Sequence, residues 1–238
     1  MTQLIGHGIY SVPEAARLSG IAAVKIRRWV FGYHTKPPGS DTQEHRPGIW
    51  EPEYSDEDEP ALSFHDLLEV RFVDAFRRHG VSLQAIRVAA ARARELVDTH
   101  YPFTCRQFQT DGRTIFGDIV DELSDAEDRK KLLDLVKRQY VFRDVVAPSL
   151  YKGIEYDQDG DALRWFPNAR DRHIVLDPER VFGKPILTDY AVPTETIAAA
   201  VEAEGNARKV ARLYELPLND VHRAVRFEQG LAQRAGAH

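Results

Sequence analysis

The segment from Ser11 to Gly32 most limits what this chain can fold into, because it reads as two short helices separated by a tight turn. A capped helix begins at Ser11, Gly20 lies in the turn, and a second helix covers residues 22–31 before Gly32 ends it. The apolar residues that can join the two helices across the turn are Ala15, Leu18, Ile21 and Ile26. The spacing predicts a helix-turn-helix over about residues 10–32.

The charge of this segment differs from that of the whole chain. The protein has a net charge of -5, whereas residues 1–36 hold five basic side chains and one acid, Glu14, a local balance of about +4. DNA binding needs only a local positive patch, because Lys and Arg contact phosphate and Arg can also bind guanine. The predicted DNA-binding residues are Arg17, Lys25, Arg27, Arg28 and Lys36.

Two motifs in this segment resemble a known family. Residues Tyr10 to Ile21, followed by Ile26-Arg27-Arg28-Trp29, are similar to the DNA-binding head of MerR-type regulators. The resemblance implies that Arg27 and Arg28 lie on a recognition helix and that a wing follows it. The candidate wing residues are Lys36, His45 and Arg46, with Ile49-Trp50 as the returning strand.

Helical patterns continue after residue 60. Ser63 with Asp66 resembles a capping box and begins a helix that Gly80 ends, and a second helix runs from Ser82 to about Asp98. From 100 to 172 the pattern is mixed. Residues 114–119 fit a strand or the start of a helix, residues 126–140 read as a helix, and two short strands flank the turn 157–161.

The last region predicts two short strands and three helices. The strands fall at 174–178 and 183–187, and the helices at 194–204, 206–214 and 218–230. The fold class is therefore mainly α with short β elements: a winged, MerR-like helix-turn-helix, a mixed middle region, and a β-hairpin plus three-helix bundle. The predicted domains are 1–100, 101–172 and 173–238.

The C-terminal region gives a second resemblance. This region is similar to a small bacterial domain of unknown function that often occurs alone as a presumed antitoxin. The resemblance rests on Ile174-Val175-Leu176-Asp177-Pro178, on Gly183-Lys184-Pro185-Ile186 and on the three helices that follow. With the MerR-like head, this layout resembles the larger VapB-type antitoxins of bacterial type II toxin–antitoxin pairs. The resemblance implies a non-catalytic chain without a cofactor that neutralises a toxin, a PIN-domain ribonuclease, and binds operator DNA to repress its own operon.

The basic residues of the C-terminal helices have two interpretations. They could face DNA phosphates from a second helix-turn-helix, or they could lie on a bundle that dimerises or binds a partner protein. These residues are Arg208, Lys209, Arg212, Arg223 and Arg226. Because symmetric operators are usually read by dimers, we predict a homodimer.

Two other functions are compatible with the sequence. In a ligand-responsive MerR-like regulator, aromatic residues of the middle region would line a pocket, namely Tyr151, Tyr156, Trp165 and Phe166. In a metal-dependent nuclease, Asp118 would share a helix face with Asp121 or Glu122. Acids in a charged stretch usually form a solvated helix surface, so we predict no metal site and no enzyme.

Two features bear on the compartment. No apolar run approaches the roughly 20 residues that a membrane-spanning helix needs. Cys105 is the only cysteine, so no intramolecular disulfide can form, and we expect it to be buried or incidental. The sequence therefore predicts a cytoplasmic protein.

Overall fold

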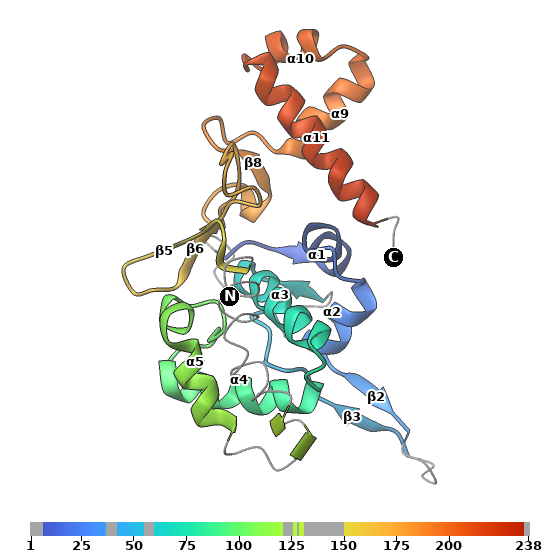
Figure 1. The fold of residues 1–238 in the computed structure, drawn as a ribbon. Coiled ribbons are helices and arrows are strands. Elements are labelled where there is room, and N and C mark those ends of the chain that lie inside the picture. The colour runs from blue at the N-terminus through green and yellow to red at the C-terminus, as the bar shows by residue number, and fades with distance from the viewer. Residues whose placement is uncertain are drawn as a thin grey trace.

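The structure is a computed structural model that describes residues 7–36, 42–54, 60–120, 126–127, 129–130 and 150–235. Helices α1 to α3 lie in the middle of the view in Figure 1, between a projecting β2–β3 hairpin and the C-terminal helices α9 to α11. A sheet of strands β5 to β8 lies to the left of these helices in the view, and α11 contacts α1 directly. Helices make up most of the described fold, with short strands between them.

The predicted helix-turn-helix is formed by α1 (Val12–Ser19) and α2 (Ala23–Val30). The Ser11 hydroxyl accepts the Glu14 N–H at 3.3 Å, and the Glu14 carboxylate accepts the Ser11 N–H at 2.8 Å. Gly20 ends α1 in the left-handed conformation, with φ of 71°. The residues predicted to join the helices are all buried, namely Ala15, Leu18, Ile21 and Ile26.

A hairpin follows α2, but its second strand differs from the prediction. Strand β2 (Tyr33–Thr35) pairs with β3 (Glu44–Arg46), so the returning strand is not Ile49-Trp50. Those two residues turn back into the core, where the Ile49 N–H donates to the Trp29 carbonyl at 2.7 Å. Gly48 permits this return, because a Cβ there would lie 2.0 Å from the Val30 carbonyl oxygen.

Three helices build the body behind the helix-turn-helix. Helix α3 (Phe64–Arg78) begins at the predicted Ser63–Asp66 capping box, and α4 (Leu83–Val97) begins at Ser82. Strand β1 (Tyr10–Ser11) pairs with β4 (Ala61–Leu62) just before α3. Helix α5 (Arg106–Val120) contains the segment 114–119, which is therefore helical and not a strand. The predicted helix 126–140 lies mostly outside the described residues.

The four strands after residue 150 form one antiparallel sheet in sequence order. They are β5 (Ile154–Tyr156), β6 (Ala162–Trp165), β7 (Ile174–Leu176) and β8 (Pro185–Leu187), with a short 3₁₀ helix, η2 (Val181–Gly183), before β8. The turn between β5 and β6 is closed by the Asp157 carboxylate, which accepts the N–H groups of residues 159, 160 and 161 at 2.8–2.9 Å. This bonding gives Asp157 a structural role in the turn.

The C-terminal helices are α9 (Thr194–Glu204), α10 (Ala207–Leu213) and α11 (Leu218–Ala235). They share a small core around Ile197, Val210 and Val221. The main core joins α1 to α4 with residues of the middle region such as Phe103 and Trp165, so the predicted boundary at residue 100 does not coincide with a change of core. Among the described helices, none is long and apolar enough to cross a membrane.

Glu69 lies inside this core at 2% exposure, and it makes stability depend on pH. Burial raises the pKa of Glu69 from 4.5 to about 8, although hydrogen bonds from Phe103 and Thr104 oppose the rise. The unfolded chain releases this proton near pH 4.5, whereas the folded chain holds it to about pH 8. The free energy of unfolding should therefore fall as pH rises through this window.

We predict that Glu69→Gln removes this pH dependence, because the amide has no proton to release. Between pH 5 and pH 8 the native chain should lose on the order of 3 kcal/mol more stability than the variant, since one pKa unit is about 1.4 kcal/mol. Urea unfolding at both pH values measures the difference. Glu95→Gln, at an exposed position, is the control and should follow the native chain. Parallel curves for Glu69→Gln and the native chain would contradict the prediction.

Candidate nucleic-acid interface

Helix α2 presents three basic side chains to solvent. Lys25, Arg27 and Arg28 are exposed, whereas Ile26 and Trp29 from the same helix are buried in the core. The helix is short enough that its apolar residues fix one face and leave the cations on the other. These three predicted residues are therefore brought together on one element.

Arg28 also connects α2 to the hairpin. Its guanidinium lies over the Tyr33 ring, 3.9 Å from the ring centroid. The hydrogen bond from Arg28, together with its charge, lowers the pKa of Tyr33. The first residue of the hairpin is thus held against the exposed face of α2.

A groove of about 400 Å³ opens beside α2, and its described lining adds cations that the sequence reasoning missed. Arg77 and Arg78, at the end of α3, line it with Lys25 and Arg28. One acid, Asp74, also lines the groove, and it pairs with Arg78 at 2.6 Å. A surface with this excess of positive charge suits a phosphate backbone. The available signal was the pair of arginines in the last turn of the predicted helix from Ser63.

The hairpin carries the predicted wing residues. Lys36 directly follows β2 and is exposed, and the His45 ring lies 5.0 Å from that of His34 across the two strands. Arg46 pairs with Glu44 at 3.2 Å. Arg87 of α4 holds the base of the hairpin, since its guanidinium donates to the Pro47 carbonyl at 2.8 Å. The base of the hairpin is therefore fixed, and its surface is exposed and partly basic.

Arg17 lies on α1 and contacts the C-terminal helices. Its Nη1 donates to Glu228 of α11 at 3.1 Å, and its Nη2 lies 3.9 Å from Glu195 of α9. The structure therefore does not bring Arg17 together with the cations of α2. Its charge is satisfied by carboxylates within the fold.

The basic residues of the C-terminal helices fall into two groups. Lys209 pairs with Glu204, and Arg223 pairs with Asp220 at 2.7 Å and with Asp171 at 3.5 Å. Arg208, Arg212 and Arg226 are exposed. Next to Arg212, Leu213 is 61% exposed and Tyr214 is 38% exposed, so the end of α10 combines positive charge with an apolar surface.

The aromatic and cysteine candidates from the sequence lie outside the basic surface of α2. Tyr151, Trp165 and Phe166 are core residues, Tyr156 is half-buried, and Trp165 lines a pocket beside α3. No group of three metal-ligating side chains occurs among the described residues. Asp121 and Glu122 and the side chain of Asp118 lie outside the described residues. Cys105 is buried, and burial raises the pKa of its thiol.

Two segments match sequence families. Residues 8–90 match a family described as "Putative DNA-binding HTH domain". This match covers α1 to α3 and the first half of α4, so the class defined by the N-terminal fold is a helix-turn-helix DNA-binding domain. Residues 174–227 match a family described as "Protein of unknown function (DUF433)".

The relatives are similar to nearly the whole chain. This chain is 24% identical over 214 residues to "Putative antitoxin VapB45" of Mycobacterium tuberculosis (strain ATCC 25618 / H37Rv), and the match covers 87% of each of the two chains. Its fold is similar to the crystal structure of Rv2018 from Mycobacterium tuberculosis, with a TM-score of 0.62, 19% identity, and coverage of 91% of this chain and 96% of that one. The sequence match supports a VapB-like antitoxin.

We predict that Arg17 contributes to stability more than to DNA affinity. A double-mutant cycle with Arg17→Gln and Glu228→Gln should give a coupling energy of about 1 kcal/mol in urea unfolding, because Arg17 is partly shielded and Glu228 is 11% exposed. Arg17→Gln should weaken DNA binding by less than Arg28→Gln in a fluorescence anisotropy titration. Zero coupling, together with equal losses of DNA affinity, would contradict this placement.

Proposed function

We propose that this chain is a cytoplasmic antitoxin that neutralises a partner toxin and binds operator DNA to regulate its own operon. The observation that carries the proposal is the exposed basic face of α2, within a segment that matches a DNA-binding family, in a chain similar along most of its length to an antitoxin. The chain itself performs no catalysis in either role.

The proposed DNA binding is supported by the geometry of α2 and its groove. Lys25, Arg27 and Arg28 project from one short helix, and Arg77 and Arg78 lie beside it. We assign α2 to the major groove, as in MerR-like regulators, and the β2–β3 hairpin to the flanking backbone as a wing. Contacts from Arg27 and Arg28 would supply both affinity and base discrimination.

We predict that replacing Arg27 and Arg28 together with alanine weakens binding to the operator and flattens its dependence on salt. Fewer counterions are released when two phosphate or base contacts are lost, so the slope of log K against log salt should fall by about 2. Anisotropy titrations at several salt concentrations measure this slope. Arg92→Ala on α4, where Arg92 pairs with Glu95, is the control. An unchanged affinity and slope in the double variant would exclude α2 as the reading helix.

The operator would be read by a homodimer, since each chain contributes one such head and symmetric operators need two. The C-terminal helices would then serve the protein partner. We assign the end of α10 to this contact, because Arg208 and Arg212 stand beside exposed Leu213 and Tyr214. Aromatic residues and arginine are enriched at protein interfaces, whereas phosphate contacts do not need an apolar surface.

The proposed neutralisation of a toxin is tested by co-expressing this chain with the protein encoded next to it in its native operon. We predict that this neighbour is a ribonuclease of the PIN-domain type, that it arrests growth alone, and that co-expression of this chain restores growth. Leu213→Asp should weaken the complex at least tenfold, because it places a charge in an apolar contact. Growth assays and calorimetry of the purified pair measure both effects.

The control is Glu202→Lys on α9, an exposed charge change that should leave the affinity unchanged. A neighbour that neither arrests growth nor binds the chain would remove the antitoxin role and leave a DNA-binding regulator. Equal affinities for Leu213→Asp and the native chain would remove the end of α10 from the contact.

A further inference from the structure

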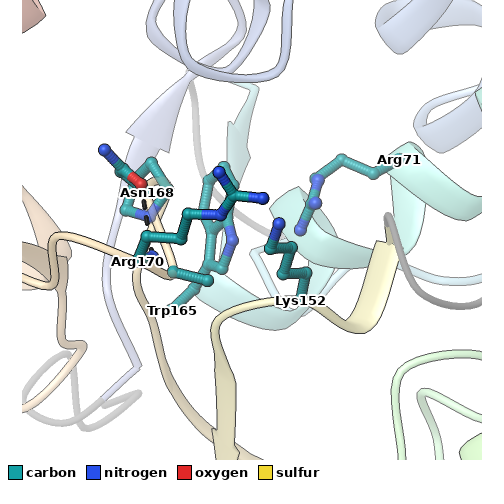
Figure 2. A pocket seen from close by; sticks show the side chains of 7 residues that line it. Arg71, Lys152, Trp165, Asn168 and Arg170 are labelled. Atoms are coloured by element: carbon teal, nitrogen blue, oxygen red, sulfur yellow. Dashed lines mark hydrogen bonds between the residues drawn. The ribbon is translucent and has the colours of Figure 1, made fainter.

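A second positively charged site lies away from the proposed DNA surface, between α3 and the β5–β8 sheet. It is a pocket of about 310 Å³, and its seven described lining residues include Arg71, Lys152 and Arg170 but no acid. Figure 2 shows the two guanidinium groups and the ammonium group pointing toward one another. Three like charges that converge in this way repel one another unless an anion lies between them.

Arg71 gives the pocket its unusual chemistry. One of its nitrogens, Nη2, donates to the Leu150 carbonyl at 3.3 Å, whereas Nη1 is shielded from solvent and has no hydrogen-bond partner among the described residues. Burial lowers the pKa of Arg71 to about 10, so the group is still charged at neutral pH. A shielded cation without a carboxylate is costly, and such groups are normally paired.

Trp165 adds a neutral donor to the same site. Its ring lies under the Arg71 guanidinium, with 4.1 Å between the Arg71 Cζ and the ring centroid. The indole N–H is buried and also has no partner among the described residues. The Arg71 guanidinium and the Trp165 indole thus each have a donor without a partner among the described residues, and Lys152 and Arg170 lie beside them. An oxyanion with several oxygens could accept hydrogen bonds from all of these groups.

The backbone around the pocket holds these groups in place. The Phe166 N–H donates to the Gly153 carbonyl at 2.8 Å, which fixes the segment of Lys152 against that of Trp165. Gly153 is required, because it has a φ of 85° and a Cβ there would lie 2.1 Å from the Phe166 carbonyl oxygen. The Asn168 side chain accepts the Arg170 N–H at 3.2 Å, which shapes the turn that carries Arg170.

An acid of the same sheet, Glu155, is already paired with other cations. Glu155 on β5 pairs with Arg164 on the neighbouring strand and with Arg172 after the turn. Side chains alternate along a strand, so Arg164 points away from the face that carries Trp165. Among the described residues, no carboxylate lines the pocket or pairs with its three cations.

We propose that this pocket binds a small phosphorylated molecule through Arg71, Lys152 and Arg170, with the indole N–H of Trp165 as a further donor. A single carboxylate would neutralise one of three cations, whereas a phosphate or diphosphate brings two or more charges and several acceptor oxygens. The volume lies at the lower end of the range for ligand sites, which fits a compact molecule. This site would make the chain responsive to a ligand in addition to its toxin and DNA.

The test is isothermal titration of the full chain with sodium pyrophosphate, with sodium acetate as the comparison, at constant ionic strength. The native chain should bind pyrophosphate and show no saturable binding of acetate. Lys152→Gln and Arg170→Gln change exposed side chains, and each should weaken pyrophosphate binding about tenfold, and both together about a hundredfold. Arg164→Gln, on the opposite face of β6, is the matched control and should change the affinity by less than about twofold.

Several results would overturn the proposal. They are a native chain that does not bind pyrophosphate, equal affinities for the Lys152→Gln/Arg170→Gln double variant and the native chain, and an equal loss for Arg164→Gln. Titration with a short DNA duplex distinguishes the source of the phosphate. If the double variant loses duplex affinity in proportion to pyrophosphate affinity, the pocket belongs to the nucleic-acid interface; unchanged duplex affinity supports a free phosphorylated ligand.

Discussion

The buried carboxylate of Asp66 is the contact on which the rest of the structure depends. It accepts the Ser63 N–H at 3.0 Å and the indole N–H of Trp50 at 2.5 Å, so it joins the start of α3 to the chain that returns from the hairpin. Burial raises its pKa, and these hydrogen bonds oppose the rise. Burying a carboxyl group is costly unless its oxygens accept hydrogen bonds, so these bonds favour keeping the two segments together.

Helix α3, once fixed at this end, carries both candidate sites. Its last turn brings Arg77 and Arg78 to the groove beside α2, and its middle brings Arg71 to the pocket beside the sheet. Helices in a packed core move as rigid units, because interior packing leaves little room for bending. A change in the position of α3 caused by the proposed ligand at Arg71 would therefore reach the proposed DNA-binding surface without any change in α2 itself.

The sequence predicted the elements whose signals are local, and it failed where a distant contact decides. Caps and glycines placed α1 to α4 and α9 to α11 closely, because these signals lie within a few residues of each helix end. The returning strand was placed too late, because the close approach of Gly48 to Val30 is a tertiary contact. Arg17 resembled its neighbours in charge, but its partner Glu228 is 211 residues away, so no window of sequence contains the pair.

The same distinction explains why charge counting locates a binding surface only in part. Residues 1–36 are basic in an acidic chain, yet one of their cations is neutralised by α11, while α3 returns Arg77 and Arg78 to the α2 groove. An overall charge of -5 opposes non-specific attraction to DNA, because the field of the whole protein repels phosphate at long range. On the proposed function, affinity would then come from the few cations that the fold leaves exposed on α2 and its groove. DNA binding would depend on the helix-helix packing that gathers these cations, and not on the total content of Lys and Arg.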